Sequence, residues 1–171
     1  MKIKKYFIFY FVLVSTFFYT FAKSDEKIIV VDLNYILSES VEGKKIIDEL
    51  QAIKKKNEKN YNSIEKELDK KKNEITKLKN VLSKEEYNKK VLEFNKKGKN
   101  FELKRFEIEK SFEILKKKKL NTFFDNLDNI MKEYMSNNDI SFILEKKNII
   151  ISKDIHDRTN DILNLINSKI K

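Results

Sequence analysis

Residues 78–94 read Leu-Lys-Asn-Val-Leu-Ser-Lys-Glu-Glu-Tyr-Asn-Lys-Lys-Val-Leu-Glu-Phe, and this stretch decides the fold. On either side of it, apolar residues recur every three or four positions, which is typical of long amphipathic helices. The spacing breaks once, where Ser83 and Glu86 have the separation of a capping box at a helix start. The stretch therefore predicts a turn near residues 80–84 between two helices, with a single continuous helix through Ser83 as the alternative.

The predicted first helix runs from about Lys44 to Leu82 and has an irregular apolar seam. Asn57 and Asn60 occupy seam positions at which apolar side chains would pack better. The other seam positions are Ile46, Leu50, Ile53, Ile64, Lys71 and Leu78, with Leu68, Ile75 and Leu82 displaced by one.

The predicted second helix has a cleaner seam, which continues less strictly to Tyr134. Its residues are Tyr87, Val91, Phe94, Gly98, Phe101, Arg105, Ile108, Phe112, Leu115, Leu120, Phe123, Leu127 and Ile130. Two such seams predict an antiparallel coiled-coil hairpin, an arm that covers residues 44–134. Because Gly98 costs about 1 kcal/mol relative to alanine in mid-helix, and several seam residues are polar, we expect arms that pack weakly and bend.

Two sets of arm residues are candidates for binding. Apolar residues off the seam either widen the stripe that covers the partner helix or face a cavity and contact clients; they are Leu92, Leu103 and Phe106, with Ile114 further along. Lysines near the predicted turn are either solvated helix faces or contacts to an anionic surface; they are Lys70, Lys71, Lys72, Lys77, Lys79, Lys84, Lys89 and Lys90.

Charge is concentrated on the predicted arm. The chain has 37 basic and 27 acidic residues, a formal net charge of +10. Between Lys44 and Lys119 there are 25 basic and 14 acidic residues, whereas the rest of the chain after residue 22 is mildly acidic. A basic surface favours anionic partners such as lipid head groups or nucleic acid.

The first 22 residues resemble a secretory signal peptide. A basic start containing Lys4 and Lys5 precedes an apolar run, and Thr20-Phe21-Ala22 resembles a small-x-small cleavage site. We expect cleavage after Ala22, with an uncleaved membrane anchor as the alternative. The chain has no cysteine, so an exported protein of this length must be stabilised by packing or oligomerisation, which suits a bacterial periplasm.

The segments 23–43 and 135–171 are predicted to form a β-rich oligomerisation body with short helices. Strands are expected at residues 28–31, 140–145 and 148–151, the last two joined by a polar turn, and short helices at residues 35–40 and after Asp157 or Thr159 as a cap. These elements are too few for an independent core. Their strand edges would also be left unpaired and prone to aggregation. Pairing of these edges with other copies of the chain would remove this problem, so we expect a homo-oligomer.

Several of these residues together resemble one family. Over residues 27 to about 169, the order of short motifs around the long charged arms is similar to that of the Skp (OmpH-like) outer membrane protein chaperones. Before the arms these motifs are Val31-Asp32, Glu39-Ser40 and Gly43-Lys44, and after them Asp157 and Thr159 followed by Ile162-Leu163. The resemblance implies an α+β, mostly α fold, in which a small β-barrel built by three subunits holds three helical-hairpin arms around a cavity.

The same resemblance implies a function. Such proteins are periplasmic homotrimers that hold unfolded outer membrane β-barrel proteins without ATP, and an anionic membrane surface or lipopolysaccharide is a further expected partner. The resemblance implies no catalytic residue, metal site or cofactor.

Other classes are less consistent with the sequence. An enzyme is disfavoured because the one histidine, His156, lies in a polar turn, and no cysteine nucleophile or phosphate-binding glycine loop is present. Basic helical arms resemble a nucleic-acid-binding surface, but export would remove that target. A structural coiled coil or envelope tether without chaperone activity is the stronger alternative, and it predicts a stable extended rod.

Overall fold

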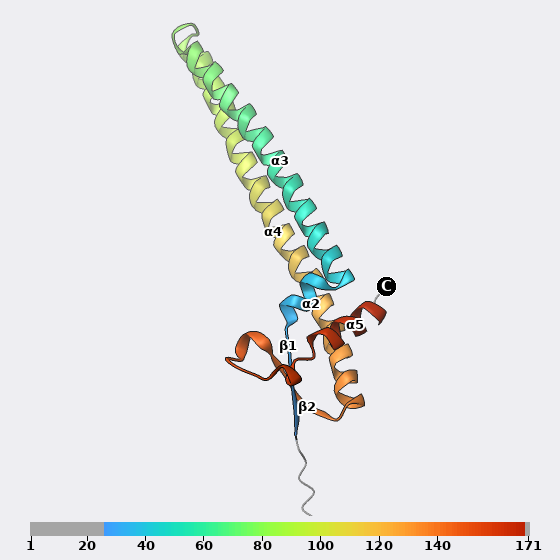
Figure 1. Cartoon of the computed structure of the whole chain (residues 1–171). Helices are drawn as coiled ribbons and strands as arrows, with labels where there is room; N and C mark the ends of the chain where they lie inside the picture. Colours follow the sequence, from blue (N-terminus) through green and yellow to red (C-terminus); the bar gives the residue numbers. More distant parts are fainter. Residues whose placement is uncertain (1–25, 170–171) are drawn as a thin grey trace, which may run out of the picture.

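Two long helices project from a small body of strands and short helices in the computed structural model, which describes residues 26–169 (Figure 1). The elements are β1 (Lys27–Val31), α2 (Leu33–Glu39), α3 (Val41–Lys77), α4 (Lys84–Asn137), β2 (Ile140–Glu145) and α5 (Thr159–Lys169). Short 3₁₀ turns cover Leu78–Asn80, Lys146–Asn148 and Asp154–His156. The predicted signal peptide of residues 1–22 lies outside the described residues.

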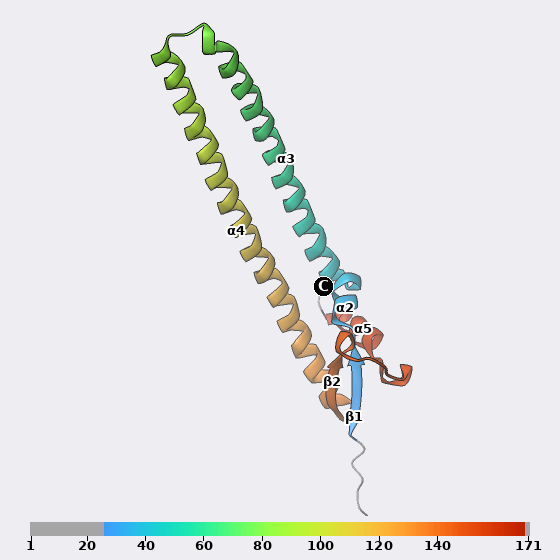
Figure 2. The ribbon, with the colours of Figure 1, turned by 90° about the vertical axis from the view of Figure 1, so that its left-hand side faces the viewer.

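Helices α3 and α4 form the predicted hairpin and run side by side from the body to the turn (Figures 1 and 2). The 37 residues of α3 and the 54 of α4 correspond to lengths of roughly 55 and 80 Å. A single continuous helix through Ser83 is therefore wrong. Because α4 is longer than α3, its last turns pass the base of α3 and enter the body, where Phe123, Leu127 and Ile130 are buried.

The seam of α4 lies where the spacing predicts it. Every predicted seam residue from Tyr87 to Leu120 is half-buried except Arg105, which is exposed. Phe123, Leu127 and Ile130 then become fully or nearly fully buried as the helix enters the body. The heptad-like pattern of the second helix was therefore sufficient to identify the face that packs on α3.

The seam of α3 differs from the prediction at one point. Asn60 is exposed and Tyr61 is buried in its place, so the seam steps by four residues twice, from Ile53 through Asn57 to Tyr61. Two successive steps of four locally unwind a coiled coil. They also bring Leu68 and Ile75 into register with the seam, so their predicted displacement by one was wrong.

The sheet has two parallel strands in the described residues. Strand β1 pairs with β2 in the register Ile29 with Ile143 and Val31 with Glu145. The predicted third strand at residues 148–151 is wrong, because the 3₁₀ turn after β2 diverts the chain away from the sheet. The second edge of β1 is instead contacted at Val30, whose carbonyl accepts a hydrogen bond from the amide of Arg158 at 3.0 Å.

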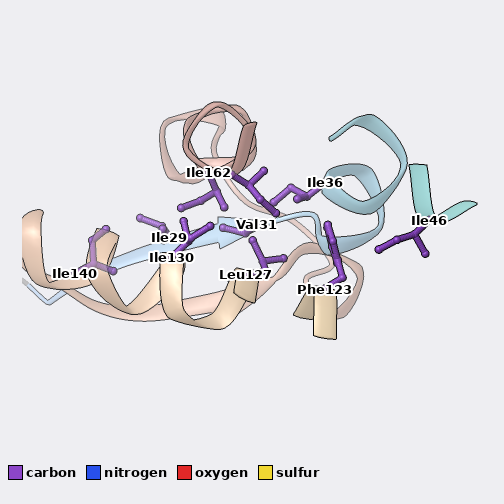
Figure 3. Packing of buried hydrophobic residues seen from close by; sticks show 10 residues of the cluster. Ile29, Val31, Ile36, Ile46, Phe123, Leu127, Ile130, Ile140 and Ile162 are labelled. Atoms are coloured by element: carbon purple, nitrogen blue, oxygen red, sulfur yellow. The ribbon is translucent and has the colours of Figure 1, made fainter. Parts of the chain in front are cut away.

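The hydrophobic core lies in the body, between the sheet, the end of α4 and the two short helices. Figure 3 shows side chains from all of these elements meeting in one cluster. Its buried members are Ile29, Val31, Ile36, Ile46, Phe123, Leu127, Ile130, Ile140, Ile162 and Ile166. Helix α3 contributes one buried residue to this core, Ile46 at its base, and the remaining helical members come from α2, α5 and the last turns of α4.

Side-chain hydrogen bonds join the segment after β1 to the start of α5. The hydroxyl of Thr159 accepts a hydrogen bond from the amide of Asp32 at 2.9 Å, and Asp157 accepts one from the amide of Thr159 at 2.9 Å. Lys146 lies 2.7 Å from Asp157. Burial alone would raise the pKa of Asp157, but the hydrogen bonds from Lys146 and Thr159 outweigh it and lower that pKa to about 2.

Candidate functional site

The predicted tip lysines surround the turn at the far end of the arm. They lie at the end of α3, in the 3₁₀ turn and in the first two turns of α4. Seven of the eight are exposed, and Lys71 is half-buried on the seam. None of the eight forms an ion pair with a carboxylate within residues 26–169. Their positive charge is therefore available at the surface.

The turn itself is held by the predicted capping box. The hydroxyl of Ser83 accepts a hydrogen bond from the amide of Glu86 at 3.3 Å, and the carboxylate of Glu86 accepts one from the amide of Ser83 at 3.2 Å. The hydrogen bonds from Ser83 lower the pKa of Glu86. Beside this cap, the side chain of Val81 is 76% exposed, so the tip combines lysines with one apolar group.

Two lysines face each other across the arms. Lys71 of α3 lies close to Lys97 of α4, and this close approach of a second ammonium group lowers the pKa of Lys97. Gly98, a seam residue, follows Lys97, and a Cβ atom added to Gly98 would meet no atom of α3 within 4 Å. A pair of like charges and an absent side chain at the same level support the prediction that the arm packs weakly there.

The mid-arm is held by an aromatic and ionic cluster around Tyr61. The rings of Tyr61 and Phe101 meet edge-on with centroids 6.3 Å apart, and the guanidinium of Arg105 lies 5.4 Å from the Tyr61 ring centroid. Arg105 also pairs with Glu65 at 3.4 Å and Glu109 at 2.9 Å. The apolar spacing did not predict a role for Tyr61, although an aromatic residue next to a seam asparagine is a usable signal.

A groove of about 710 Å³ opens between the two helices near the base of the arm. Its walls are formed by Leu50, Phe112 and Leu120 together with polar residues such as Glu58 and Lys116. Tyr61 also lines it, and its buried hydroxyl has no hydrogen-bond partner in the described residues. The helices are thus incompletely packed here.

The apolar candidates lie on α4 and point away from α3. Leu92 is 61% exposed, Leu103 54% and Phe106 66%, and Ile114 further along is 60% exposed. At about 100° per residue, the first three lie about 120–180° around α4 from the seam. The interpretation that they widen the stripe covering the partner helix is therefore wrong within this chain, and they are available to a separate partner.

The described residues contain no arrangement that suggests metal chemistry. No group of three or more His, Cys, Asp or Glu is placed to hold a metal ion in residues 26–169. His156 is exposed, and its Nδ1 atom lies 3.0 Å from the carbonyl oxygen of Ile28 in β1. Across the same residues, every helix is too short or too polar to cross a membrane.

Comparisons with known proteins agree with this architecture. The family model of outer membrane protein (OmpH-like) matches residues 27–166. A crystal structure of a candidate outer membrane chaperone (OmpH-like) from Caulobacter crescentus CB15 has a similar fold, with a TM-score of 0.76 and 14% identity, over 85% of this chain and 86% of that one. No curated protein matches the sequence. Since the family model covers the body and the whole arm, this chain belongs to the OmpH-like outer membrane protein family.

Proposed function

We propose that this chain is an ATP-independent holdase chaperone that binds unfolded outer membrane β-barrel proteins and keeps them from aggregating in transit. The observation that carries the proposal is the arm: a long hairpin outside the core that exposes Leu92, Leu103 and Phe106 among lysines. Leu103 and Phe106 are three residues apart on the same side of α4, and grouped exposed apolar side chains mark interaction sites. The OmpH-like family, and the chaperone description of the Caulobacter structure, support the same role.

The physical basis is the match between the arm and its proposed client. An unfolded membrane barrel exposes strands with alternating apolar residues, which aggregate readily. Many weak contacts along a bending arm can shield these strands without selecting one sequence. Binding and release then need no nucleotide, and the proposal requires no catalytic residue, metal or cofactor.

The proposed working form is a periplasmic homotrimer, in which the segments 23–43 and 135–171 form the shared body and residues 44–134 form the arm. The two-stranded sheet leaves Phe142 of β2 51% exposed. In the loop after β2, Ile150 and Ile151 are 103% and 88% exposed. Strand edges and apolar loops of this kind support pairing with other copies. We also propose that the signal peptide is cleaved after Ala22.

The tip lysines are proposed to contact anionic surfaces. Seven exposed lysines around one turn, without ion pairs to neighbouring carboxylates in the described residues, would attract an anionic membrane surface or lipopolysaccharide. That attraction would fall as salt rises. No nucleic acid is proposed as a physiological partner.

The holdase proposal is tested by aggregation. An unfolded outer membrane barrel protein is diluted from urea with and without the purified mature chain, and light scattering is followed. We expect suppression at one trimer per client. Absence of suppression at that ratio would refute the holdase function.

The trimer is tested by solution molar mass with small-angle X-ray scattering. We expect three copies with splayed arms, and loss of the trimer in Ile150→Asp/Ile151→Asp. The control is Lys153→Asp, which changes an exposed neighbour without removing apolar area. A dimeric extended rod would favour the structural coiled-coil alternative instead.

A further inference from the structure

Helix α4 carries a second ordered row of residues on the side opposite α3. Leu92, Leu103 and Ile114 are eleven residues apart, so each step returns to nearly the same angle with a drift of about 20°. Phe106 lies close to this line, and lysines fill the intervening positions at spacings of three or four. We call the full set the outer row: Leu92, Lys96, Lys99, Leu103, Phe106, Lys110, Ile114 and Lys117.

The outer row is accessible, and its lysines form no ion pairs in residues 26–169. Its four apolar side chains are at least half exposed, and its four lysines are exposed. None of these lysines forms an ion pair in residues 26–169, whereas cations on the side of α4 that faces α3 do, as Lys119 does with Glu49 at 2.5 Å. The row contains no carboxylate, although Glu102, Glu107 and Glu113 lie on its flanks.

The outward side of α3 provides the informative contrast. It is also basic, and its lysines at the matching level of the arm are exposed, namely Lys55, Lys59, Lys66 and Lys70. Asn62 lies between them and Asn73 follows Lys70, so this side of α3 carries no large apolar side chain over residues 55–73. The chain therefore places a similar positive charge on both outer sides of the arm but combines it with apolar groups on α4 alone.

We propose that the outer row of α4 is the client-binding surface of the arm, and that it selects segments in which apolar residues alternate with carboxylates. This inference rests on the proposed holdase function and specifies which side of the arm performs it. Alternating lysines and apolar side chains are complementary to alternating carboxylates and apolar side chains. The tip lysines and the outward side of α3 then contribute general attraction without binding apolar groups.

The length of the outer row fits one strand of such a client. From Leu92 to Lys117 the helix advances about 38 Å at 1.5 Å per residue. An extended strand covers that distance with about 11 residues, and a membrane-spanning β-strand has about 9–11. One arm therefore offers a surface for one unfolded barrel strand.

The test compares three double variants of the full mature chain. Leu103→Gln/Phe106→Gln removes apolar groups of the outer row, Lys99→Gln/Lys110→Gln removes its charge, and Lys59→Gln/Lys66→Gln removes the same charge from α3 as a matched control. All six side chains are exposed, so we expect unchanged helicity and oligomeric mass. The measurement is the Kd for a fluorescently labelled, urea-unfolded outer membrane barrel protein, at low and high salt.

We expect the apolar variant to weaken binding about tenfold. The Lys99→Gln/Lys110→Gln variant should weaken it about threefold at low salt only, and the α3 control less than twofold. In addition, a photo-crosslinking residue in place of Leu103 should capture the client, and one in place of Asn62 should not.

Each outcome separates the inference from the proposed function. Two results would show that the outer row is not the binding surface while leaving the holdase proposal in place, provided that the parent chain binds the client. One is an apolar variant that binds as tightly as the parent chain. The other is an α3 control that loses as much affinity as Lys99→Gln/Lys110→Gln. If the parent chain does not bind at all, the inference and the holdase proposal both fall.

Discussion

The buried hydroxyl of Ser40 accepts a hydrogen bond from the amide of Gly43 at 3.1 Å, and this contact sets the direction in which the arm leaves the body. The amide of Ser40 also donates to the carbonyl of Ile36 at 2.9 Å, so one residue ends α2 and begins α3. The sharp change of direction brings the carbonyl of Leu37 to the position that a side chain of residue 43 would occupy. A glycine is therefore required there.

Gly43→Ala should destabilise the protein. An added Cβ atom would lie 1.9 Å from the carbonyl oxygen of Leu37, a backbone atom that cannot move without shifting α2. We expect a loss of about 3 kcal/mol in the free energy of unfolding, measured by urea denaturation. An unchanged urea midpoint would show that the junction between α2 and α3 is not built as described.

Gly98→Ala should have the opposite effect and serves as the control for Gly43→Ala. The added methyl group would meet no atom of α3 within 4 Å, and alanine favours a helix interior by about 1 kcal/mol. We expect a higher thermal midpoint and slower amide hydrogen exchange in the middle of α4. Faster exchange there would contradict the assignment of Gly98 as a weak point of the arm.

Lys71→Leu should tighten the arms. It replaces a half-buried lysine on the seam and removes the charge that lowers the pKa of Lys97. We expect a thermal midpoint higher by roughly 2–4 °C, and an NMR titration in which the pKa of Lys97 rises. Lys72→Leu is the matched control, since Lys72 is exposed and off the seam, and it should change neither quantity.

Asp157→Asn should destabilise the body in a pH-dependent manner. The pKa of Asp157 in the folded protein is about 2, below its ordinary value of 3.8. The charged form therefore stabilises the fold above about pH 4, and this contribution is lost as the pH falls towards 2. We expect a cost of about 1–2 kcal/mol at pH 7, because Lys146 is half exposed and solvent screens its attraction to Asp157.

Unfolding curves of both proteins between pH 2 and 7 check this prediction, and their difference should shrink towards pH 2. Asp125→Asn, at an exposed site without an ion pair in the described residues, is the control. A difference that stays constant with pH would mean that the Asp157 charge is not responsible.

The candidate site was partly accessible from the sequence. Leu92, Leu103 and Phe106 were identified because they lie off the seam, and the seam of α4 is regular enough to define an outside. The lysines Lys96, Lys99, Lys110 and Lys117 follow the same three-four spacing but were overlooked, because lysine is so frequent on the arm that single positions carried no signal. Their proposed role depends on their forming no ion pair with the carboxylates on the flanks of the row, which only the folded arm shows.

Local features determined the extent of each element. Side-chain spacing and caps within a few residues were sufficient to predict four features from the sequence by itself. These are the capping box at Ser83, the seam of α4, strand β1 and helix α5. The tertiary structure decided which distant segments meet: β1 pairs in parallel with β2, and Asp32 bonds Thr159 across 127 positions. It also left residues 149–151 without a strand partner and placed Tyr61, instead of Asn60, on the seam. The reason is that long-range pairing depends on which edges and faces remain free once the arm has folded, and no local spacing encodes that choice.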